Sequence, residues 1–441
     1  MSRSSPKRQS RVPASPAARL IKLGLTAGGM AAGGVAEGFR RLGRGTTDDS
    51  HSVLLTPANA RRLARRLSEM RGAAMKLGQL LSMEGEHLLP AEFAAALTLL
   101  RDSADSMPPG QLRGILGREY GHGWESRFSS FDFEPDAAAS IGQVHHAITA
   151  DGRELALKIQ YPGVARSISS DVDNLGMLLK ASRLIPAGVD MAPLMREAKR
   201  QLRQEADYLL EGEYLERYGE QLADEPGFRV PALHRDFTTR RILAMDYAPG
   251  SPLEHLSHAD IEQAERDRVG GILEHLLFRE LFEFRLMQSD PNFGNYRYSP
   301  ASGTVTLLDF GSTVEFEPGF VRGYADVCRA IMAGDRTRVA EAAAGLGYLN
   351  SDDPPAHAEQ VVDLILLVCE PLAHDGVYDF QASNLLQRAA QAGMDLVFQS
   401  EHFQSPPPST AFLHRKLVGS FLLCARIGAR VNVRELISEF L

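Results

Sequence analysis

The sequence predicts an α+β fold with two lobes, the second of which is largely helical. Two segments with alternating apolar residues, 144–149 and 154–159, flank the turn residues Asp151 and Gly152 and therefore predict a β-hairpin. The apolar run 305–308 predicts a further buried strand. Beyond that strand, periodic apolar segments predict a series of helices at 320–332, 336–346, 357–370 and 380–398.

Length and composition limit the class of protein. A chain of 441 residues exceeds the usual size of a single hydrophobic core, so we expect two or three units. A net charge of −8 argues against a general nucleic-acid binder, which needs a concentrated basic surface. The three cysteines, Cys328, Cys369 and Cys424, lie far apart without C-x-x-C spacing, which predicts buried thiols in a reducing compartment.

The first 45 residues differ in composition from the rest. Residues 1–18 are rich in Ser, Pro, Arg and Lys without any acid, which predicts a disordered basic tail, although transit peptides have a similar composition. Residues 19–45 carry glycines at small-x-x-x-small spacing, flanked by basic residues. This pattern is typical of a membrane-associating or self-associating helix, and self-association would give a homodimer. A Gly-rich flexible linker is the alternative.

Residues 46–130 predict an N-terminal helical extension. Within it, the helix 72–83 is mainly apolar but contains the K-x-G-Q motif formed by Lys76 and Gln79 with Gly78 between them. A lysine in such a helix either extends its charged end to water or is buried against carboxylates from elsewhere. The residues of this segment leave both interpretations open.

Residues 131–250 have the layout of a kinase small lobe. Ala137, Ala139, Gly142 and Val144 occupy the fixed places of G-x-G-x-x-G-x-V, with alanine in place of the first two glycines. Because alanine lacks the freedom of glycine at positive φ, we expect a stiffer phosphate loop. Lys158 on the following strand stands where the V-A-I-K lysine contacts the phosphates, with a solvent-facing lysine as the alternative.

A strand lysine of this kind needs a glutamate to orient it. The long helical segment 191–218 contains Glu205, Asp207 and Glu211 in Q-E-A-D-Y-L-L-E. We expect Glu211 to pair with Lys158, and Glu205 and Asp207 to receive Lys76, although most carboxylates on such a helix are simply solvated. Two strands are predicted at 230–233 and 241–245, followed by a hinge at 245–250.

Residues 251–441 contain the segments best suited to phosphoryl transfer. After an apolar helix at 266–284, Asp290 and Asn295 hold the D-x-x-x-x-N spacing of a protein-kinase catalytic loop. Asp309 begins a D-F-G tripeptide at the end of the strand 305–308. Carboxylate and amide oxygens at these positions suit Mg²⁺ bound to nucleotide phosphates. Each tripeptide alone is a weak signal, and their order along the chain gives them weight.

The ordered set of motifs resembles the UbiB/ADCK family of atypical kinases. The set runs from K-x-G-Q through A-A-A-S at 137–140, Lys158, E-x-D at 205–207 and Q-S-D-P-N-F-G-N to D-F-G, and it covers about residues 71–316. The Q-x-D-P-N form is similar to the coenzyme Q biosynthesis branch. The resemblance implies a bilobal protein-kinase-like fold with a family-specific N-terminal helical extension and a helical C-lobe.

The resemblance also implies roles for individual residues. It implies that Asp290, Lys158 and Glu211 are catalytic, and that Asn295 and Asp309 bind Mg²⁺. It implies that Lys76 and Gln79 cover the cleft where a protein substrate would lie, held by Glu205 and Asp207. The residues expected to contact ATP are Ala137, Ala138, Ala139, Ser140, Lys158, Met245 and Tyr247.

In this family, such an arrangement disfavours phosphorylation of proteins in trans. The resemblance therefore implies an ATPase supporting ubiquinone biosynthesis at a membrane, facing the bacterial cytoplasm or the mitochondrial matrix. Its expected partners are Mg²⁺, ATP, the lipid membrane, isoprenoid quinone precursors and ubiquinone-biosynthesis enzymes. A phosphotransferase acting on a small molecule, lipid or protein is one alternative, and a nucleotide-dependent lipid-binding scaffold is another.

Overall fold

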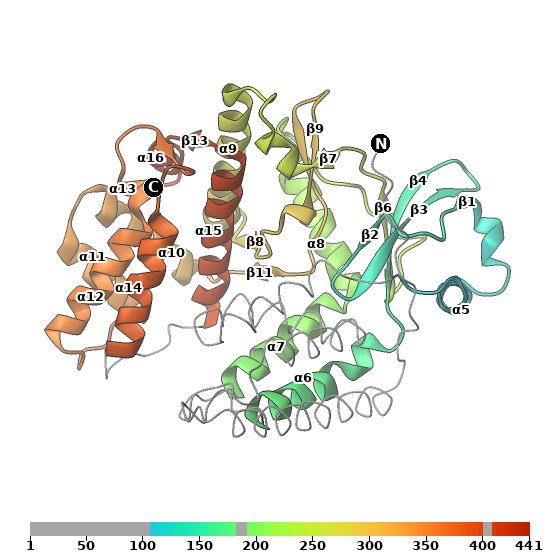
Figure 1. Ribbon diagram of the computed structural model, residues 1–441, viewed down its shortest axis with the longest axis horizontal. Coiled ribbons are helices and arrows are strands. Elements are labelled where there is room, and N and C mark those ends of the chain that lie inside the picture. Colours follow the sequence, from blue (N-terminus) through green and yellow to red (C-terminus); the bar gives the residue numbers. More distant parts are fainter. Residues whose placement is uncertain (1–105, 182–191, 400–407) are drawn as a thin grey trace, which may run out of the picture. The chain divides into compact units, whose positions relative to one another are not determined.

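The computed structural model describes residues 106–181, 192–399 and 408–441. The chain forms two compact units (Figure 1). Unit 1 extends to Glu213 and includes Ala232–Tyr247, whereas unit 2 comprises Tyr214–Pro231 and Ala248–Leu441. The predicted tail, the Gly-rich segment and the K-x-G-Q residues Lys76 and Gln79 lie outside the described residues.

Unit 1 is built on an antiparallel sheet of five strands in the order β1-β3-β4-β6, with β2 beside β3. The predicted hairpin joins β3 to β4, and Gly152 adopts a positive φ of 89° in its turn. Leu155 and Leu157 of β4 are completely buried, which explains the apolar pattern of that strand. The strands are β1 Phe128–Phe131, β2 Ala137–Ala138, β3 Gly142–Thr149, β4 Glu154–Gln160 and β6 Ile242–Asp246.

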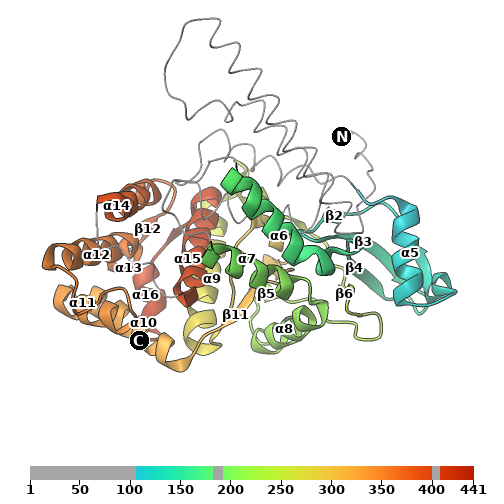
Figure 2. The same cartoon turned by 90° about the horizontal axis from the view of Figure 1, so that it is seen from below.

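Among the described residues, four helices accompany this sheet, and Figure 2 shows α6 and α7 side by side. They are α5 Pro109–Glu119, α6 Val164–Ala181, α7 Ala192–Glu205 and α8 Tyr208–Gln221, whose last residues belong to unit 2. The single helix predicted over 191–218 is wrong, because the chain breaks between α7 and α8. Asp207 begins α8 by accepting a hydrogen bond from the amide of Leu210 at 3.3 Å, as acidic residues commonly do at a helix start.

Unit 2 contains a mixed sheet in the order β5-β10-β9-β7, in which only β5 and β10 are parallel. The strand predicted at 305–308 is β10. The strand predicted at 230–233 is wrong, because β5 lies earlier and Leu233 forms only an isolated bridge with Met245 in unit 1. The strands are β5 Phe228–Arg229, β7 Ser251–Pro252, β8 Leu286–Gln288, β9 Tyr296–Ser299, β10 Thr304–Leu307, β11 Thr313–Glu315, β12 Tyr378–Asp379 and β13 Arg430–Val431.

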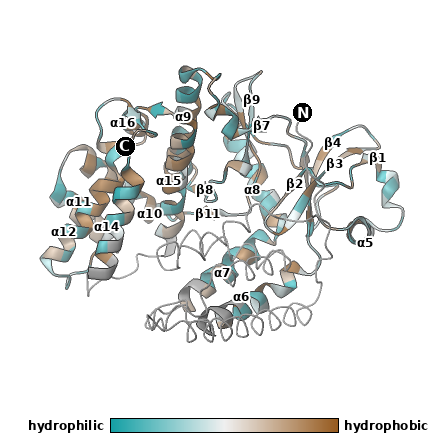
Figure 3. Cartoon of the chain, in the orientation of Figure 1, coloured by the Kyte–Doolittle hydropathy of each residue, from teal (hydrophilic) through white to brown (hydrophobic). Residues whose placement is uncertain are grey.

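The remainder of unit 2 is mainly helical, as the sequence predicts, and hydrophobic and hydrophilic residues share α10, α12 and α14 (Figure 3). The helix predicted to start at Phe380 begins later, because Tyr378 and Asp379 pair with β13 and the Asp379 carboxylate accepts from the Ala382 amide at 2.9 Å. The helices are α9 Gln263–Phe278, α10 Pro318–Met332, α11 Arg336–Gly345, α12 Pro355–Val368, α13 Glu370–Ala373, α14 Leu385–Gln399, α15 Pro408–Ile427 and α16 Val433–Ser438. The predicted α+β class is confirmed.

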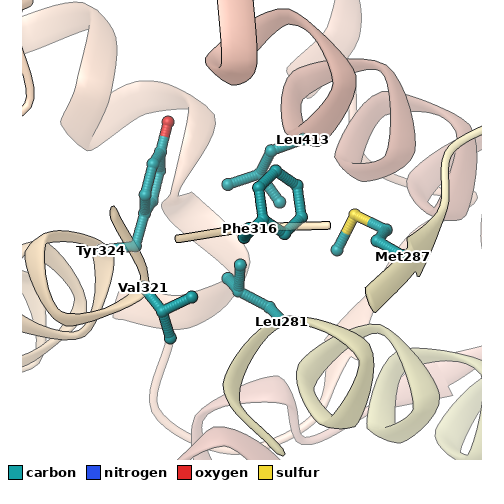
Figure 4. Close-up of a cluster of buried hydrophobic side chains, with 6 residues drawn as sticks. All are labelled: Leu281, Met287, Phe316, Val321, Tyr324 and Leu413. Atoms are coloured by element: carbon teal, nitrogen blue, oxygen red, sulfur yellow. The ribbon is translucent and has the colours of Figure 1, made fainter. Parts of the chain in front are cut away.

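A hydrophobic cluster fixes the strand β8, which leads into the catalytic-loop motif. Leu281 comes from the π-helical turn Arg279–Glu283 that follows α9, and Leu413 comes from α15. These side chains surround Met287 of β8, which is completely buried. The cluster, shown in Figure 4, consists of Leu281, Met287, Phe316, Val321, Tyr324 and Leu413.

The cysteines and the apolar character of the helices can also be examined in the structure. Cys328, Cys369 and Cys424 are free thiols; Cys424 is buried as predicted, whereas the other two are only partly buried. Burial raises the pKa of the Cys424 thiol well above its usual value. Burial likewise raises the pKa of Cys369 to about 12. These thiols are therefore protonated at neutral pH. Among the described helices, none combines the length and the apolar character needed to cross a membrane.

Candidate active site

Lys158 and Glu211 form a buried ion pair in unit 1. The Nζ atom of Lys158 lies 2.6 Å from Oε1 of Glu211, and the two side chains are 7% and 1% exposed. Lys158 lies on β4 between β3 and β6, and Glu211 lies in the first turn of α8. The ring of Tyr208 is 5.4 Å from the ammonium. Because a buried charge without a partner costs several kcal/mol, each residue fixes the other.

The alanine-rich loop is held by α7. The loop turns between β2 and β3 through a hydrogen bond from the amide of Ala139 to the carbonyl of Gly142, at 3.0 Å. The hydroxyl of Ser140 donates to the carboxylate of Glu205 at 3.0 Å. Glu205, which the sequence placed opposite Lys76, therefore anchors the phosphate-loop motif, and Asp207 begins the helix that carries Glu211.

Gly142 permits a close contact that no other residue would allow. A Cβ atom at this position would lie 2.4 Å from the carbonyl oxygen of Ile159 and 2.9 Å from the hydroxyl of Tyr208. Gly142 has no positive φ, so space rather than backbone conformation requires glycine here. The third glycine position of the loop motif thus keeps β3 close to the strand that carries Lys158.

Gly142→Ala is expected to weaken nucleotide binding and to lower the stability of unit 1 by about 1–3 kcal/mol, because the added Cβ must displace strand backbone. The measurements are thermal unfolding and titration with MgATP. Gly114→Ala on α5 is the matched control, since its Cβ would meet only Arg118 at 3.9 Å, and alanine favours a helix. Equal stability and affinity of the two variants would contradict the role assigned to this contact.

The predicted hinge residues lie at the end of β6. Met245 is buried and pairs with Ala156 in the sheet. The amide of Tyr247 donates to the carbonyl of Glu154 at 3.0 Å, and its ring packs against His146 with centroids 4.5 Å apart. A nucleotide contact by Tyr247 would therefore involve its ring or carbonyl and not its amide.

The catalytic-loop motif of unit 2 is folded around the carbonyl of Asp290. This oxygen accepts from the side-chain amides of Gln288 at 2.9 Å and Asn295 at 2.8 Å, and from the backbone amide of Asn292 at 2.8 Å. Because the Asn295 nitrogen faces this carbonyl, its amide oxygen is turned away from the carbonyl. Asp290 and Asn295 are thus positioned relative to each other within one short loop.

The D-F-G motif is fixed by both backbone and side-chain contacts. The carboxylate of Asp309 accepts from the amide of Gly311 at 2.9 Å, and Phe310 is buried against Tyr218 with ring centroids 4.7 Å apart. The amide of Leu308 donates to the carbonyl of Asn295 at 3.0 Å, which ties the two motifs together. A cavity of about 10 Å³ is lined by both Asn295 and Asp309.

The ion pair of Lys416 and Glu280 also lines this cavity, and Asn295 and Asp309 are the two lining residues whose oxygens suit a hard divalent cation that also binds phosphate. Asn295 and Asp309 offer an amide oxygen and a carboxylate, which are oxygen ligands of the kind Mg²⁺ prefers. Among the described residues, no group of three His, Cys, Asp or Glu could hold a metal ion. Two protein ligands suit Mg²⁺ completed by water and nucleotide phosphates better than they suit a cation bound by protein alone.

A buried charge network behind the loop was missed by sequence reasoning. The ammonium of Lys416 on α15 lies 2.7 Å from the carboxylate of Glu280, and the side chains are 5% and 1% exposed. Glu280 also accepts from the hydroxyl of Tyr218 at 2.7 Å and from the amide of Gln288 at 3.1 Å. Burial is the largest single influence and lowers the pKa of Lys416, but Glu280, Tyr296 and Glu274 together raise it by more, so the net shift of the pKa is upward. Lys416 is therefore charged.

Helix α15 contacts the catalytic loop at two further places. The guanidinium of Arg415 donates to the carboxylate of Asp290 at 3.3 Å, and the two side chains are 9% and 19% exposed. A Cβ atom on Gly419 would lie 1.8 Å from Cγ of Pro291, so the helix and the loop meet at van der Waals distance. The adjacent basic residues 415–416 in an apolar helix are the sequence signal that marks this contact.

Glu274 of α9 is a second buried acid near this network and also contacts α15. It accepts from the hydroxyl of Ser420 at 2.7 Å. Burial raises the pKa of Glu274, and its hydrogen bonds with Ser420 and Cys424 only partly oppose the shift. Two glutamates beside apolar residues, Glu274 in α9 and Glu280 in the π-helical turn that follows, are the corresponding signal on this side.

Comparison with known proteins gives consistent results. Residues 99–343 match the ABC1 atypical kinase-like domain. The chain is 39% identical to the mitochondrial atypical kinase COQ8B of Rattus norvegicus over 434 residues, covering 98% of this chain and 81% of the relative. It is 35% identical to the mitochondrial atypical kinase COQ8 of Saccharomyces cerevisiae, covering 98% of this chain and 86% of the relative.

A solved structure is also similar to this chain. The complex of Rv3197 with erythromycin from Mycobacterium tuberculosis has a TM-score of 0.61 and 25% sequence identity, and the match covers 87% of this chain and 96% of that chain. The family resemblance predicted from the motifs is confirmed by these matches. The chain belongs to the ABC1 family of atypical kinases and is similar to COQ8 proteins over almost its whole length.

Proposed function

We propose that the chain is an atypical kinase-like ATPase that supports ubiquinone biosynthesis at a membrane. The observation that supports the proposal is that the side chains predicted to act in phosphoryl transfer are each held by contacts of their own unit. Lys158 is paired with Glu211 in unit 1, while Asp290 and the two cation ligands are fixed in unit 2. A chain that only bound nucleotide passively would not need Asp290 to be held so closely.

The roles follow from the chemistry of each group. Lys158 would bind nucleotide phosphates, with the loop Ala137–Ser140 and the residues Met245 and Tyr247 contacting the rest of ATP. Asn295 and Asp309 would hold Mg²⁺, which when bound neutralises charge on the phosphate oxygens. The list of proposed catalytic residues is Asp290, Lys158 and Glu211.

Asp290 would orient the attacking water or hydroxyl. Its contact with Arg415 restricts the rotation of the carboxylate. A carboxylate fixed in one orientation would position the nucleophile and accept its proton as phosphoryl transfer proceeds. ATP hydrolysis needs no bound protein substrate, which agrees with the family's poor fit to protein phosphorylation in trans.

The proposed partners follow from the family resemblance. They are the membrane, isoprenoid quinone precursors and the other enzymes of ubiquinone biosynthesis, with residues 19–45 as the membrane-associating or dimer-forming segment. The protein would face the mitochondrial matrix or the bacterial cytoplasm. Curated relatives that are named as mitochondrial support the first of these locations.

Phosphate release from MgATP tests the proposed activity. The purified full chain is assayed alone, with vesicles, and with a phenolic mimic of a quinone precursor. Asp290→Asn is expected to lower turnover by about 10²–10⁴-fold, because the nucleophile loses its orienting carboxylate. Asp352→Asn is the matched control, since Asp352 is exposed and far along the chain from the motifs.

The same samples separate the alternatives. Release of free phosphate that depends on Asp290 supports the ATPase. Transfer of the phosphoryl group to the phenolic compound, a lipid or a protein, detected by mass spectrometry, would replace it with a phosphotransferase. Nucleotide-dependent vesicle binding without turnover would replace it with a lipid-binding scaffold.

A further inference from the structure

A basic cavity in unit 1 shares no residue with the proposed nucleotide and magnesium ligands. Arg118 lies near the end of α5, Arg166 lies in the first turn of α6, and Arg241 precedes β6. The three side chains line a cavity of about 350 Å³, and no Asp or Glu is among its described lining residues. The chain as a whole carries a net charge of −8, so the positive charge of this cavity is opposite in sign to the net charge of the chain. The other lining residues are Ile115, Gln160, Pro162 and Gly163.

The positive charges of the cavity are poorly compensated. Arg241 lies 3.5 Å from the carboxylate of Glu119, and this is a long contact for an ion pair. Within residues 106–181, 192–399 and 408–441, Arg118 and Arg166 form no ion pair. All three arginines are exposed at the protein surface. At least two guanidinium groups therefore face the cavity without a carboxylate that neutralises them.

The position of Arg166 adds a second, independent argument. The N-terminus of a helix carries a partial positive charge, which disfavours a cation and favours an anion. The first turn of α6 contains no acidic residue, although acids are common there, and instead carries Arg166. Arg118 differs, because it lies in the last turn of α5, where a cation is favourable. An anion in the cavity would remove the repulsion between Arg166 and the end of α6.

We propose that the cavity formed by Arg118, Arg166 and Arg241 binds a phosphate group. A guanidinium group donates paired N–H hydrogen bonds to phosphate oxygens. Three guanidinium groups together carry more N–H donors than one carboxylate can accept. Amides near Gly163 at the start of α6 would add donors of the kind that bind phosphate at helix ends. The volume accommodates a phosphate together with part of the molecule that carries it. Free phosphate compounds and phospholipid headgroups share this chemistry.

Calorimetric titration of the full chain with inorganic phosphate tests the site for small anions. Flotation with vesicles of phosphatidylcholine alone, or of an equal mixture of phosphatidylcholine and phosphatidylglycerol, tests it for headgroups. Arg166→Gln is expected to weaken the binding by about tenfold, which corresponds to about 1.4 kcal/mol. Arg240→Gln is the matched control, because it removes an exposed charge next to Arg241 from a residue that does not line the cavity. A non-hydrolysable ATP analogue with Mg²⁺ is present throughout, so that the nucleotide residues are occupied and no phosphate is released.

The outcomes decide the proposal. Selective loss of phosphate binding in Arg166→Gln supports a site for a soluble phosphate compound, and selective loss of binding to the mixed vesicles supports a headgroup site. Equal binding by the Arg166 and Arg240 variants in both assays, or no binding by the wild type, would overturn it. Thermal unfolding without phosphate gives a further check: Arg166→Gln should not lower the midpoint, because the arginine opposes the α6 terminus.

Discussion

Asp309→Asn is expected to abolish the thermal stabilisation of the protein by MgATP. For the wild type, a ligand at a hundred times its dissociation constant contributes about 2.7 kcal/mol, which raises the unfolding midpoint by about 5–10 °C for a unit of this size. The asparagine oxygen can still accept from the Gly311 amide, so the local fold is kept. The substitution removes the negative charge that a hard cation needs. Thermal unfolding with and without MgATP measures the effect.

The control for this prediction is Asp326→Asn, which removes a carboxylate of α10 that pairs only with Arg329 in its own helix turn among its described contacts. It should respond to MgATP as the wild type does. Chelation of magnesium in the wild type should reproduce the behaviour of Asp309→Asn. If the Asp309 variant were stabilised as much as the wild type, Asp309 would not be the magnesium ligand.

Lys416→Met is expected to lower the stability of unit 2 by about 3–5 kcal/mol, the usual cost of leaving one buried charge without its partner. Glu280 would then keep only neutral donors, the Tyr218 hydroxyl and the Gln288 amide. Because Gln288 holds the carbonyl of Asp290, turnover should fall together with stability. Chemical denaturation and phosphate release measure the two effects.

A second substitution makes this prediction specific. Adding Glu280→Gln to Lys416→Met removes the uncompensated charge while keeping an oxygen for Tyr218 and Gln288, so most of the stability should return. The matched control is Lys199→Met, whose exposed pair with Asp173 should contribute about 0–1 kcal/mol. A double variant as unstable as Lys416→Met would show that size and packing, and not charge, make Lys416 necessary.

The parts of the candidate site that lie in short motifs could be predicted from the sequence. Asp290 and Asn295 are five residues apart and fold around one carbonyl, so their spacing alone implies their contact. The hairpin that presents Lys158 follows from alternation and from one glycine turn. Glu211 and Lys158 are 53 positions apart in the sequence, so their spacing does not imply a contact. The pair could be predicted only because a glutamate in the helical segment that follows matched a known kinase pattern.

Other features depend on contacts that periodicity does not encode. The break between α7 and α8 results from the cap that Asp207 forms, and a short polar side chain inside a helical pattern does not reveal which role it takes. Gly419 looks like an ordinary helix glycine until Pro291 is placed against it. Lys416 lies in α15 and Glu280 lies in the π-helical turn Arg279–Glu283, and neither segment alone indicates that these two charges will pair.

The contact between α15 and the catalytic loop has a consequence for how the protein is made. During synthesis, Asp290 leaves the ribosome long before Arg415, because the two residues are 125 positions apart in the sequence. Until α15 is synthesised, Asp290 lacks its contact with Arg415 and Pro291 lacks its contact with Gly419. Glu280 likewise lacks the ammonium of Lys416. The nascent chain therefore carries Asp290 and Glu280 without the partners that α15 supplies. Full support of the catalytic loop is expected only after the final helices of this unit are synthesised.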